Sequence, residues 1–382
     1  MSKINSAESI RGLACFAVII SHLILTFFPG LHYLNPEDEH LPNYEFFTTV
    51  FNSPFTFFYA GSAAVYIFFV LSGFVLSYAI LKSGKDINRK IASMTIKRYP
   101  RLAVPALVSC LLVWAAFHLN IDTSSATHWI SRMGSADGSM LYAIYDALIN
   151  AFIFGKSEYN WVLWTMQSEL LGSVVIFALL YIKTNFKNLV FFISSIVFLI
   201  GSFGLSTQLG FGVFCFLFGM FTYLYGFKVN NHIAILMLII GLYFAGAHNE
   251  SASYFIFNKF LGNYTHSLLS VASGPLVVYS ILMNSKLSGI LDTKPLVFLG
   301  KLSFSLYLLH MLMIYIVGMP IFNYMNSIGF AYMSSTIAAS VAVIITSLIS
   351  SIFYSEYIDD LSINIGKKIE KKRWIRKFEQ HL

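Results

Sequence analysis

Long apolar runs alternate with short polar segments along most of the chain. Most runs approach the ~20 residues that a helix needs to cross a bilayer. Backbone groups in lipid must be hydrogen-bonded within their own segment, so these runs predict helices. The ten segments lie near residues 10–28, 56–81, 99–119, 161–182, 188–205, 208–226, 233–247, 267–283, 302–322 and 331–354. The predicted fold class is all-α: a polytopic integral membrane helix bundle with about ten transmembrane helices.

One further apolar stretch, Met140–Phe154, is too short and too polar to count as an eleventh crossing. It contains Asp146 and Asn150, and it lies in the longest outer loop, roughly residues 120–160. Counting it as a span would invert every later helix and move the basic C-terminal segment to the outer side. We therefore expect an interfacial or re-entrant helix here, in a loop that covers a site.

The distribution of basic residues predicts which way the helices run. With the N-terminus placed inside, only Arg132, Lys156 and Lys259 of the 25 Lys and Arg residues fall outside, which leaves 22 on the inner side. Inner loops of membrane proteins carry this excess of positive charge. We expect both termini to be cytoplasmic and the protein to be a multi-pass protein of the inner, cytoplasmic membrane. The net charge of +7 then requires no nucleic acid partner.

Composition agrees with this picture, since 57% of residues are hydrophobic and only 11% are charged. A soluble domain carries about 25% charged residues. We expect one transmembrane domain over residues 1–355 and a basic cytoplasmic tail over residues 356–382. Cys15, Cys110 and Cys215 all lie within apolar runs, where they are typical of small buried hydrophobic residues. We therefore predict no metal site.

Ionisable residues within a span are costly and mark functional sites, which draws attention first to Arg11 and His22. The two residues are 11 positions apart, so at 100° per residue they share one helix face, about 16 Å apart along the axis. Arg11 would lie near the cytoplasmic boundary and His22 near mid-membrane. The pattern fits a snorkelling arginine with a hydrogen-bonded histidine. It equally fits a histidine that acts as a general base.

Arg98 and Arg101 lie in the inner loop segment KRYPRLAVP, at the start of the third predicted span. Their i, i+3 spacing puts two guanidinium groups on the same side of the helix. Such a pair suits phosphate or pyrophosphate. The alternative is a positively charged membrane anchor. Pro100 between them fits a first helical turn.

Glu169 is the one acidic residue, among 18, well inside a predicted span. A buried carboxylate stays ionised only beside a cation or several hydrogen-bond donors, so we expect an Arg or His partner from another helix. Trp164 precedes it in the segment NWVLWTMQSELLGS. Its ring belongs either to the interfacial aromatic belt or to the lining of a pocket.

Ser303, Tyr307 and His310 follow i, i+4, i+7 spacing in the segment KLSFSLYLLH and form one polar stripe. A polar stripe cannot face lipid cheaply, so it faces the interior of the bundle. One interpretation is hydrogen bonding between helices. The other is a functional site, which fits His310 better than Ser303.

Taken together, these motifs resemble the membrane acyltransferase 3 family along nearly the whole chain. The resemblance rests on Arg-x10-His, R-x-x-R, an aromatic run ending in Ser-Gly-Phe, Trp-[Ser/Thr]-x3-Glu and Ser-[aromatic]-x2-Tyr-x2-His. The matching residues are Arg11 and His22; Arg98 and Arg101; Ser72, Gly73 and Phe74; Trp164, Thr165 and Glu169; and Ser303, Phe304, Tyr307 and His310. Each motif alone is weak, but all five occur in order. The chain resembles the stand-alone members, which lack an added esterase-like domain.

The resemblance implies an O-acyltransferase that moves an acyl group, commonly acetyl from cytoplasmic acetyl-CoA, to a sugar hydroxyl of a cell-surface polysaccharide or its lipid-linked precursor. Acyl-CoA is then a donor substrate, and no permanently bound cofactor is expected. We expect the donor phosphates to meet Arg11, Arg98 and Arg101, and the acceptor to enter from the outer side. Direct transfer and an acyl-histidine intermediate both remain open.

The catalytic roles expected from the resemblance centre on His22 and Glu169. His22 would act as general base or take the acyl group itself, and Glu169 would orient it or balance its charge. Tyr307, Ser303 or an arginine would stabilise the oxyanion.

The rival hypothesis is a proton-coupled transporter or an exporter of a small molecule or lipid-linked sugar. Buried Arg, His and Glu suit such a carrier. The two halves of the chain nevertheless show no inverted repeat, and the arginine pair lies at one membrane face.

Overall fold

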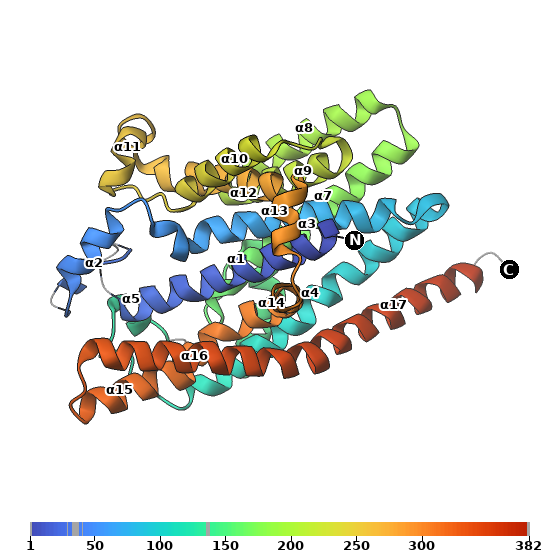
Figure 1. The fold of residues 1–382 in the computed structure, drawn as a ribbon. Helices are drawn as coiled ribbons and strands as arrows, with labels where there is room; N and C mark the ends of the chain where they lie inside the picture. The colour runs from blue at the N-terminus through green and yellow to red at the C-terminus, as the bar shows by residue number, and fades with distance from the viewer. Residues whose placement is uncertain (1, 29, 33–37, 40, 135–137, 380–382) are drawn as a thin grey trace.

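The computed structural model describes residues 2–28, 30–32, 38–39, 41–134 and 138–379, and every regular element in these ranges is a helix (Figure 1). The longer helices are α1 Ser2–Phe27, α3 Gly61–Leu81, α4 Ile87–Phe117, α7 Met166–Asn185, α8 Asn188–Leu205, α9 Thr207–Tyr225, α10 Asn231–Ala245, α12 Thr265–Leu282, α14 Lys294–Met313, α16 Tyr332–Tyr354 and α17 Asp360–Glu379. The shorter ones are α2 Tyr44–Phe51, η2 Thr56–Tyr59, η3 Gly84–Asp86, α5 His128–Ser131, α6 Met140–Tyr145, η4 Asp146–Phe154, η5 Trp161–Thr165, η6 Ala252–Tyr254, α11 Phe255–Leu261, η7 Gly262–Tyr264, α13 Ser285–Leu291, η8 Ile314–Gly318, α15 Met319–Ser327 and η9 Ser355–Asp359.

Within the described residues, nine helices are long and apolar enough to cross a membrane, which confirms a polytopic helix bundle. The tenth predicted span, near 233–247, is the shorter helix α10. Asn284, after the C-terminal end of α12, bonds Asn231 at the start of α10. At the other end of the pair, His266 of α12 bonds the carbonyl of Ala247, just after α10. Helix α10 therefore runs antiparallel to α12 over the same depth.

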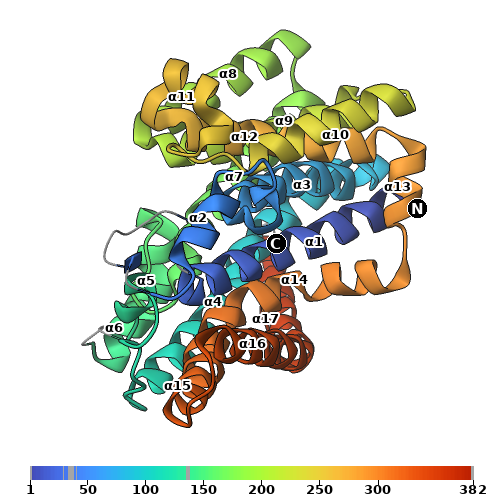
Figure 2. The same ribbon diagram turned by 60° about the vertical axis from the view of Figure 1, so that its left-hand side comes forward.

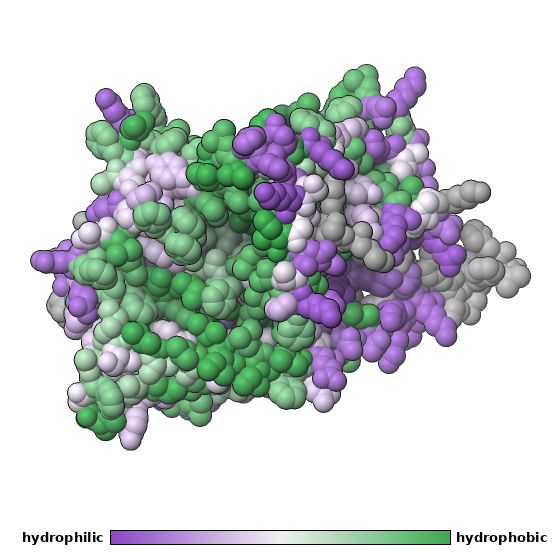
Figure 3. Space-filling model, in the orientation of Figure 1, coloured by the Kyte–Doolittle hydropathy of each residue, from purple (hydrophilic) through white to green (hydrophobic). Residues whose placement is uncertain are grey.

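Both ends of the chain lie at one end of the bundle, called here the terminal end, on the right in Figure 1. The opposite end carries α2, α5, α11 and α15 (Figure 1). Helix α1 lies between α3 and α14 and packs against both, and the views in Figures 1 and 2 agree on this. Green apolar side chains cover the body of the molecule in Figure 3, while purple polar ones gather towards the terminal end.

Close backbone contacts, made possible by glycine, lock the helices around the central α1. A Cβ on Gly300 of α14 would overlap the carbonyl oxygen of Glu8 on α1. A Cβ on Gly73 of α3 would overlap the carbonyl oxygen of Phe216 on α9. Small residues commonly allow such approach between membrane helices, where packing replaces the hydrophobic effect as the driving force. These contacts fix the helices that carry Arg11 and Ser72.

Several predicted boundaries are wrong because helices continue beyond the apolar runs. Helix α4 begins at Ile87, so Pro100 and Pro105 lie inside it and not in a first turn. The polar first part of α4 is supported by α17, which packs along it and pairs Glu370 with Lys97 at 3.1 Å. The chain also stays helical from α16 through η9 into α17, beyond the predicted span near 331–354.

The stretch Met140–Phe154 is helical, as α6 followed by the π-helical η4. It packs against α4 and α7 and is not an isolated span. The carboxylate of Asp146 is fully buried and accepts hydrogen bonds from Ser157 Oγ at 2.7 Å and from the Glu158 and Tyr159 backbone. Asp146 therefore fixes the turn that leads into η5.

Candidate active site

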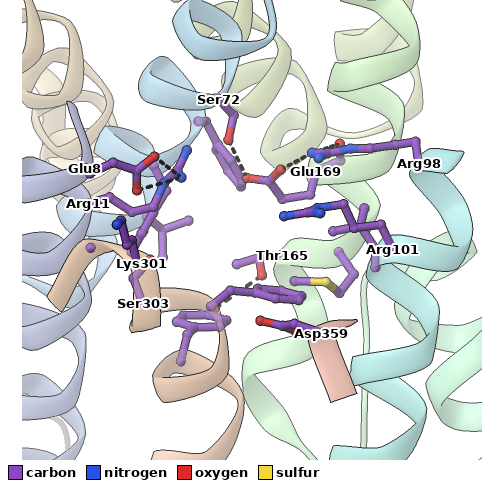
Figure 4. Close-up of a pocket in the computed structure, with 18 of the residues that line it drawn as sticks. Glu8, Arg11, Ser72, Arg98, Arg101, Thr165, Glu169, Lys301, Ser303 and Asp359 are labelled. Carbon is purple, nitrogen blue, oxygen red and sulfur yellow. Dashed lines mark hydrogen bonds and ion pairs between the residues drawn. The ribbon is translucent and has the colours of Figure 1, made fainter. Parts of the chain in front are cut away.

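A cavity of about 530 Å³ lies among α1, α3, α4, η5, α7, α14, η9 and α17, in the half of the bundle nearer the termini. We call it the terminal cavity. Four cations line it, Arg11, Arg98, Arg101 and Lys301, together with Glu8, Glu169 and Asp359 (Figure 4). Arg11 lies on α1, whereas Arg98 and Arg101 both lie on α4, and the structure brings all three to this one cavity.

Glu169 forms the most constrained ion pair of the terminal cavity. Arg98 Nη2 lies 2.6 Å from Glu169 Oε2, and both side chains are about 15% exposed. Ser72 Oγ donates to Glu169 Oε1 at 3.0 Å, and Arg98 Nε donates to Ser173 Oγ at 2.7 Å. The expected cationic partner of Glu169 is thus Arg98, and Ser72 of the Ser-Gly-Phe motif completes the pair (Figure 4).

The other cations of this cavity form weaker ion pairs or none with the described residues. Arg11 pairs with Glu8 at 3.3 Å, one turn earlier on α1. Arg101 and Lys301 are exposed and form no ion pair with any residue that the structure describes. Figure 4 shows them on different helices facing the same space. Two unpaired cations in a cavity are suited to an anionic ligand such as phosphate.

A second cavity, of about 360 Å³, lies at the opposite end of the bundle, and we call it the outer cavity. His22 lines it from α1, and Trp164 lines it from η5. His32, His248 and His266 also line it. Burial, with a smaller effect of His266, lowers the pKa of His32 to about 3, and burial lowers the pKa of His248 well below its usual value. These two imidazoles are therefore neutral at neutral pH.

His22 and His310 form a directed pair at the inner wall of the outer cavity. His22 Nδ1 and His310 Nε2 are 2.7 Å apart, and their ring planes differ by 5°. His310 Nδ1 lies 3.3 Å from the Leu306 carbonyl, which can only accept a hydrogen bond. For neutral rings, His310 Nδ1 then carries a proton and its Nε2 accepts from His22 Nδ1. His22 Nε2 is left with a free lone pair, as a general base requires.

The loop over residues 120–160 reaches this pair, as expected from the sequence. Trp129 of α5 stacks on His22 with ring centroids 5.5 Å apart. Trp161 packs edge-on against Trp129 at 5.2 Å. The Thr127 backbone N–H donates to the Thr26 carbonyl and ties the loop to the end of α1. His22 itself lies within two turns of that end, nearer to it than to the middle of its helix.

Tyr307 and Val65 line both cavities and so form the partition between them. Tyr307 Oη donates to the Val162 carbonyl at 2.9 Å and lies 3.2 Å from Thr165 Oγ1. Thr165 and Ser303 line only the terminal cavity of the two. The polar stripe predicted on this helix thus divides, with Ser303 in the terminal cavity, Tyr307 at the partition and His310 buried behind His22.

One pairing expected from the sequence is wrong. Glu169 does not orient His22, because its carboxylate is held by Arg98 and Ser72 in the other cavity. His310 takes that position instead. The reason is the position of each residue along the bundle. Glu169 on α7 and Arg98 on α4 lie at the same level of two neighbouring helices. His22 lies nearer the end of the bundle away from the termini.

The sequence reasoning also missed three residues that the structure brings to the cavities. Lys301 was counted only as a positive-inside residue, although it stands two positions before Ser303 of the motif. Asp359 was assigned to the basic tail, yet it lines the terminal cavity and accepts from Ser305 Oγ at 3.1 Å. Trp129 carries no spacing signal to link it to His22, since only the folding of the loop brings them together.

No cluster of three or more His, Cys, Asp or Glu side chains in the described ranges has the arrangement of a metal site. The three cysteines are free and buried.

Comparison with known proteins gives one match. A family model described as an acyltransferase domain matches residues 4–355, which includes the helices that line the two cavities except α17 and all but the first residue of η9. No curated protein and no solved structure matches the chain.

Proposed function

Since this chain belongs to the membrane acyltransferase 3 family and is therefore an acyltransferase, we propose that it transfers acetyl from acetyl-CoA to a sugar hydroxyl. The acceptor in this proposal is a cell-surface polysaccharide or its lipid-linked precursor. The terminal cavity takes the donor, and the outer cavity takes the acceptor.

The donor assignment is supported by the charges of the terminal cavity. Acetyl-CoA carries its negative charges on phosphates, and Arg101 and Lys301 are unpaired cations that line this cavity. Charge-assisted hydrogen bonds to such groups are about twice as strong as neutral ones. The excess of Lys and Arg in segments at the terminal end supports a cytoplasmic orientation for that end, where acetyl-CoA is made available.

The chemistry of the proposed step is carried by His22. Its Nε2 takes the proton of the acceptor hydroxyl as the oxygen attacks the thioester carbonyl carbon. The carbon–sulfur bond then breaks, and the departing sulfur receives the proton from His22. Tyr307, at the partition, donates to the carbonyl oxygen as negative charge develops there, by turning its hydroxyl proton away from the Val162 carbonyl. Glu169 holds Arg98 in place and is a positioning residue.

One observation carries the proposal: the cation-lined cavity and the histidine-lined cavity share the wall made by Tyr307 and Val65. An acyl group that reaches this wall from the terminal side is next to Tyr307, one turn before His310 on α14. His310 in turn contacts His22 on α1. A proton-coupled carrier would also use buried histidines, but the family match favours the transferase.

The donor site is tested by the double variant Arg101→Ala/Lys301→Ala, purified in detergent and assayed with labelled acetyl-CoA. Losing hydrogen bonds to a charged group costs about 1.5–3 kcal/mol each, so KM for acetyl-CoA should rise at least tenfold. Folding should be intact, because neither side chain has an ion-pair partner among the described residues to leave behind.

The matched control is Arg98→Ala, which removes a cation from the same cavity but leaves the carboxylate of Glu169 without its partner. Breaking a buried pair costs about 3–5 kcal/mol, so this variant should lose thermal stability, which the double variant should keep. An unchanged KM for acetyl-CoA in the double variant would place the donor elsewhere.

A further inference from the structure

A third cavity, of about 300 Å³, adjoins the outer cavity, and we call it the side cavity. It lies between α3, α9 and α12, which run side by side in the bundle (Figure 2). Ser62, Trp164 and His266 line both the side cavity and the outer cavity. The two spaces are therefore neighbours, separated by these three side chains, with Trp164 standing between the side cavity and the space in front of His22.

A buried hydroxyl without a partner lies in the side cavity. Ser270 of α12 is fully buried and lines the cavity, and its Oγ makes no hydrogen bond with any residue that the structure describes. Other buried serines of the same helix do make one: Ser273 donates to the Ser270 carbonyl at 2.7 Å, and Ser280 donates to the Val277 carbonyl at 2.8 Å. An unsatisfied buried hydroxyl is costly and uncommon, and a bound ligand would satisfy this one.

The other side chains that line the side cavity are uncharged, and they are either polar or aromatic. Thr207 and Gln208 line the exposed mouth of the side cavity at the start of α9, and Tyr66 and Phe211 supply aromatic surface. No Lys, Arg, Asp or Glu lines it among the residues that the structure describes. Hydroxyls and an amide that both donate and accept, set among aromatic rings, match a ligand rich in hydroxyl groups. A lipid tail would leave Ser270 and Gln208 unsatisfied, and an ion would find no opposite charge.

We propose that the side cavity is a second acceptor subsite, which holds an uncharged sugar unit joined to the unit that is acylated at His22, with Trp164 between the two units. This inference rests on the proposed function and narrows it. The acceptor is then a chain of at least two sugar units, and a free monosaccharide occupies only part of the site.

The test compares acceptors of different length. Glycan from cells that lack the protein is partly hydrolysed and sorted into mono-, di- and trisaccharide fractions. Each fraction is offered with labelled acetyl-CoA to the purified, full-length protein. We expect KM for the trisaccharide fraction to be at least fivefold lower than for the monosaccharide fraction. In the Ser270→Ala/Gln208→Ala variant the ratio of KM for the monosaccharide fraction to KM for the trisaccharide fraction should fall close to one.

Ser280→Ala is the matched control, since it removes a buried hydroxyl from the same helix away from the cavity, and it should keep the advantage. Calorimetric binding of the trisaccharide fraction without acetyl-CoA gives a second readout that does not depend on turnover. Weaker binding by the double variant, with unchanged binding by Ser280→Ala, supports the subsite.

Two results would overturn the inference while leaving the proposed function standing: equal KM values for all three fractions with the wild-type protein, or a double variant that keeps the full advantage of the trisaccharide. Failure of the wild-type protein to acetylate any fraction, or the intact glycan, would instead overturn the proposed function and the subsite with it.

Discussion

At the scale of single residues, His22, the proposed base, is paired with another histidine and not with a carboxylate. His310 is fully buried, and its two ring nitrogens are occupied by the Leu306 carbonyl and by His22. A carboxylate at this depth would need a cation or several donors to stay ionised, and no Lys or Arg among the described residues lines the outer cavity. A neutral imidazole orients His22 without that cost, though it stabilises an imidazolium less.

The pairing predicts that His310→Ala and His22→Ala act on the same step. Each should lower kcat for transfer by about 10²–10⁴-fold, the usual contribution of a positioned acid–base group, with little change in KM for acetyl-CoA. The double variant should be no worse than His22→Ala, because His310 acts through His22. The measurement is kcat for all three variants at saturating acetyl-CoA. Multiplicative losses would show that His310 has an independent role.

The candidate residues themselves could be found from the sequence, but their pairing could not. An ionisable residue within an apolar run is visible without a structure, and Arg11, His22, Glu169 and His310 all stood out in this way. Which of them meet depends on helix order and on relative depth. Neither is fixed by spacing along one helix, so Glu169 was paired with His22 when its partner is Arg98.

At the scale of the helices, the contact between α1 and α14 positions the histidine pair and part of the terminal cavity. These two helices carry Arg11 and His22 on one side and Lys301, Tyr307 and His310 on the other. Gly300 allows the backbones to touch near Glu8. The distance across this contact therefore governs whether His310 can reach His22.

The substitution Gly300→Ala should consequently cost stability as well as activity. The new methyl group would overlap the Glu8 carbonyl oxygen, which is backbone and cannot rotate away. Overpacking of this kind costs about 1–3 kcal/mol. We expect a lower melting temperature in detergent, measured by thermal unfolding followed through intrinsic tryptophan fluorescence. Gly201→Ala in α8 is the control, because nothing lies within 4 Å of the new methyl group, and an unaffected Gly300→Ala protein would contradict the tight contact.

Apolar length predicted the existence of the helices well and their ends poorly. Hydropathy reports only where lipid replaces water, so the polar first part of α4 and the continuation of α16 into α17 left no apolar signal. Both are held by packing between elements far apart in sequence, including the pair of Lys97 with Glu370. The segment near 233–247 is a helix, as its apolar sequence predicted, but at 15 residues α10 is shorter than the nine candidate spans.

At the scale of the whole molecule, the two main cavities open towards opposite ends of the bundle, and the assignment of donor and acceptor depends on which end faces the cytoplasm. The excess of basic residues at the terminal end favours a cytoplasmic position for that end. Cys15, Cys110 and Cys215 are free and buried, so replacing them gives a low-background protein for accessibility experiments.

The orientation predicts opposite behaviour for two exposed positions. In a cysteine-free background, Asn263→Cys lies at the end away from the termini, and Lys286→Cys lies on α13 at the terminal end. A membrane-impermeant maleimide added to intact cells should label Asn263→Cys, whereas Lys286→Cys should react only after the membrane is permeabilised. The reverse pattern would exchange the sides of donor and acceptor.

The partition made by Tyr307 and Val65 has an electrical consequence. Moving one elementary charge across a membrane potential of 100 mV costs or yields about 2.3 kcal/mol. In the proposed reaction the phosphates and the sulfur stay on the terminal side of the partition, and the neutral acyl group passes it towards the acceptor. The proton of the acceptor hydroxyl passes the other way, from His22 to the sulfur, so one positive charge moves with each transfer. The membrane voltage does work on that proton over the part of the membrane that it crosses, so transfer should be faster when the terminal side is the more negative one. Each acyl transfer is thereby coupled to the movement of one proton.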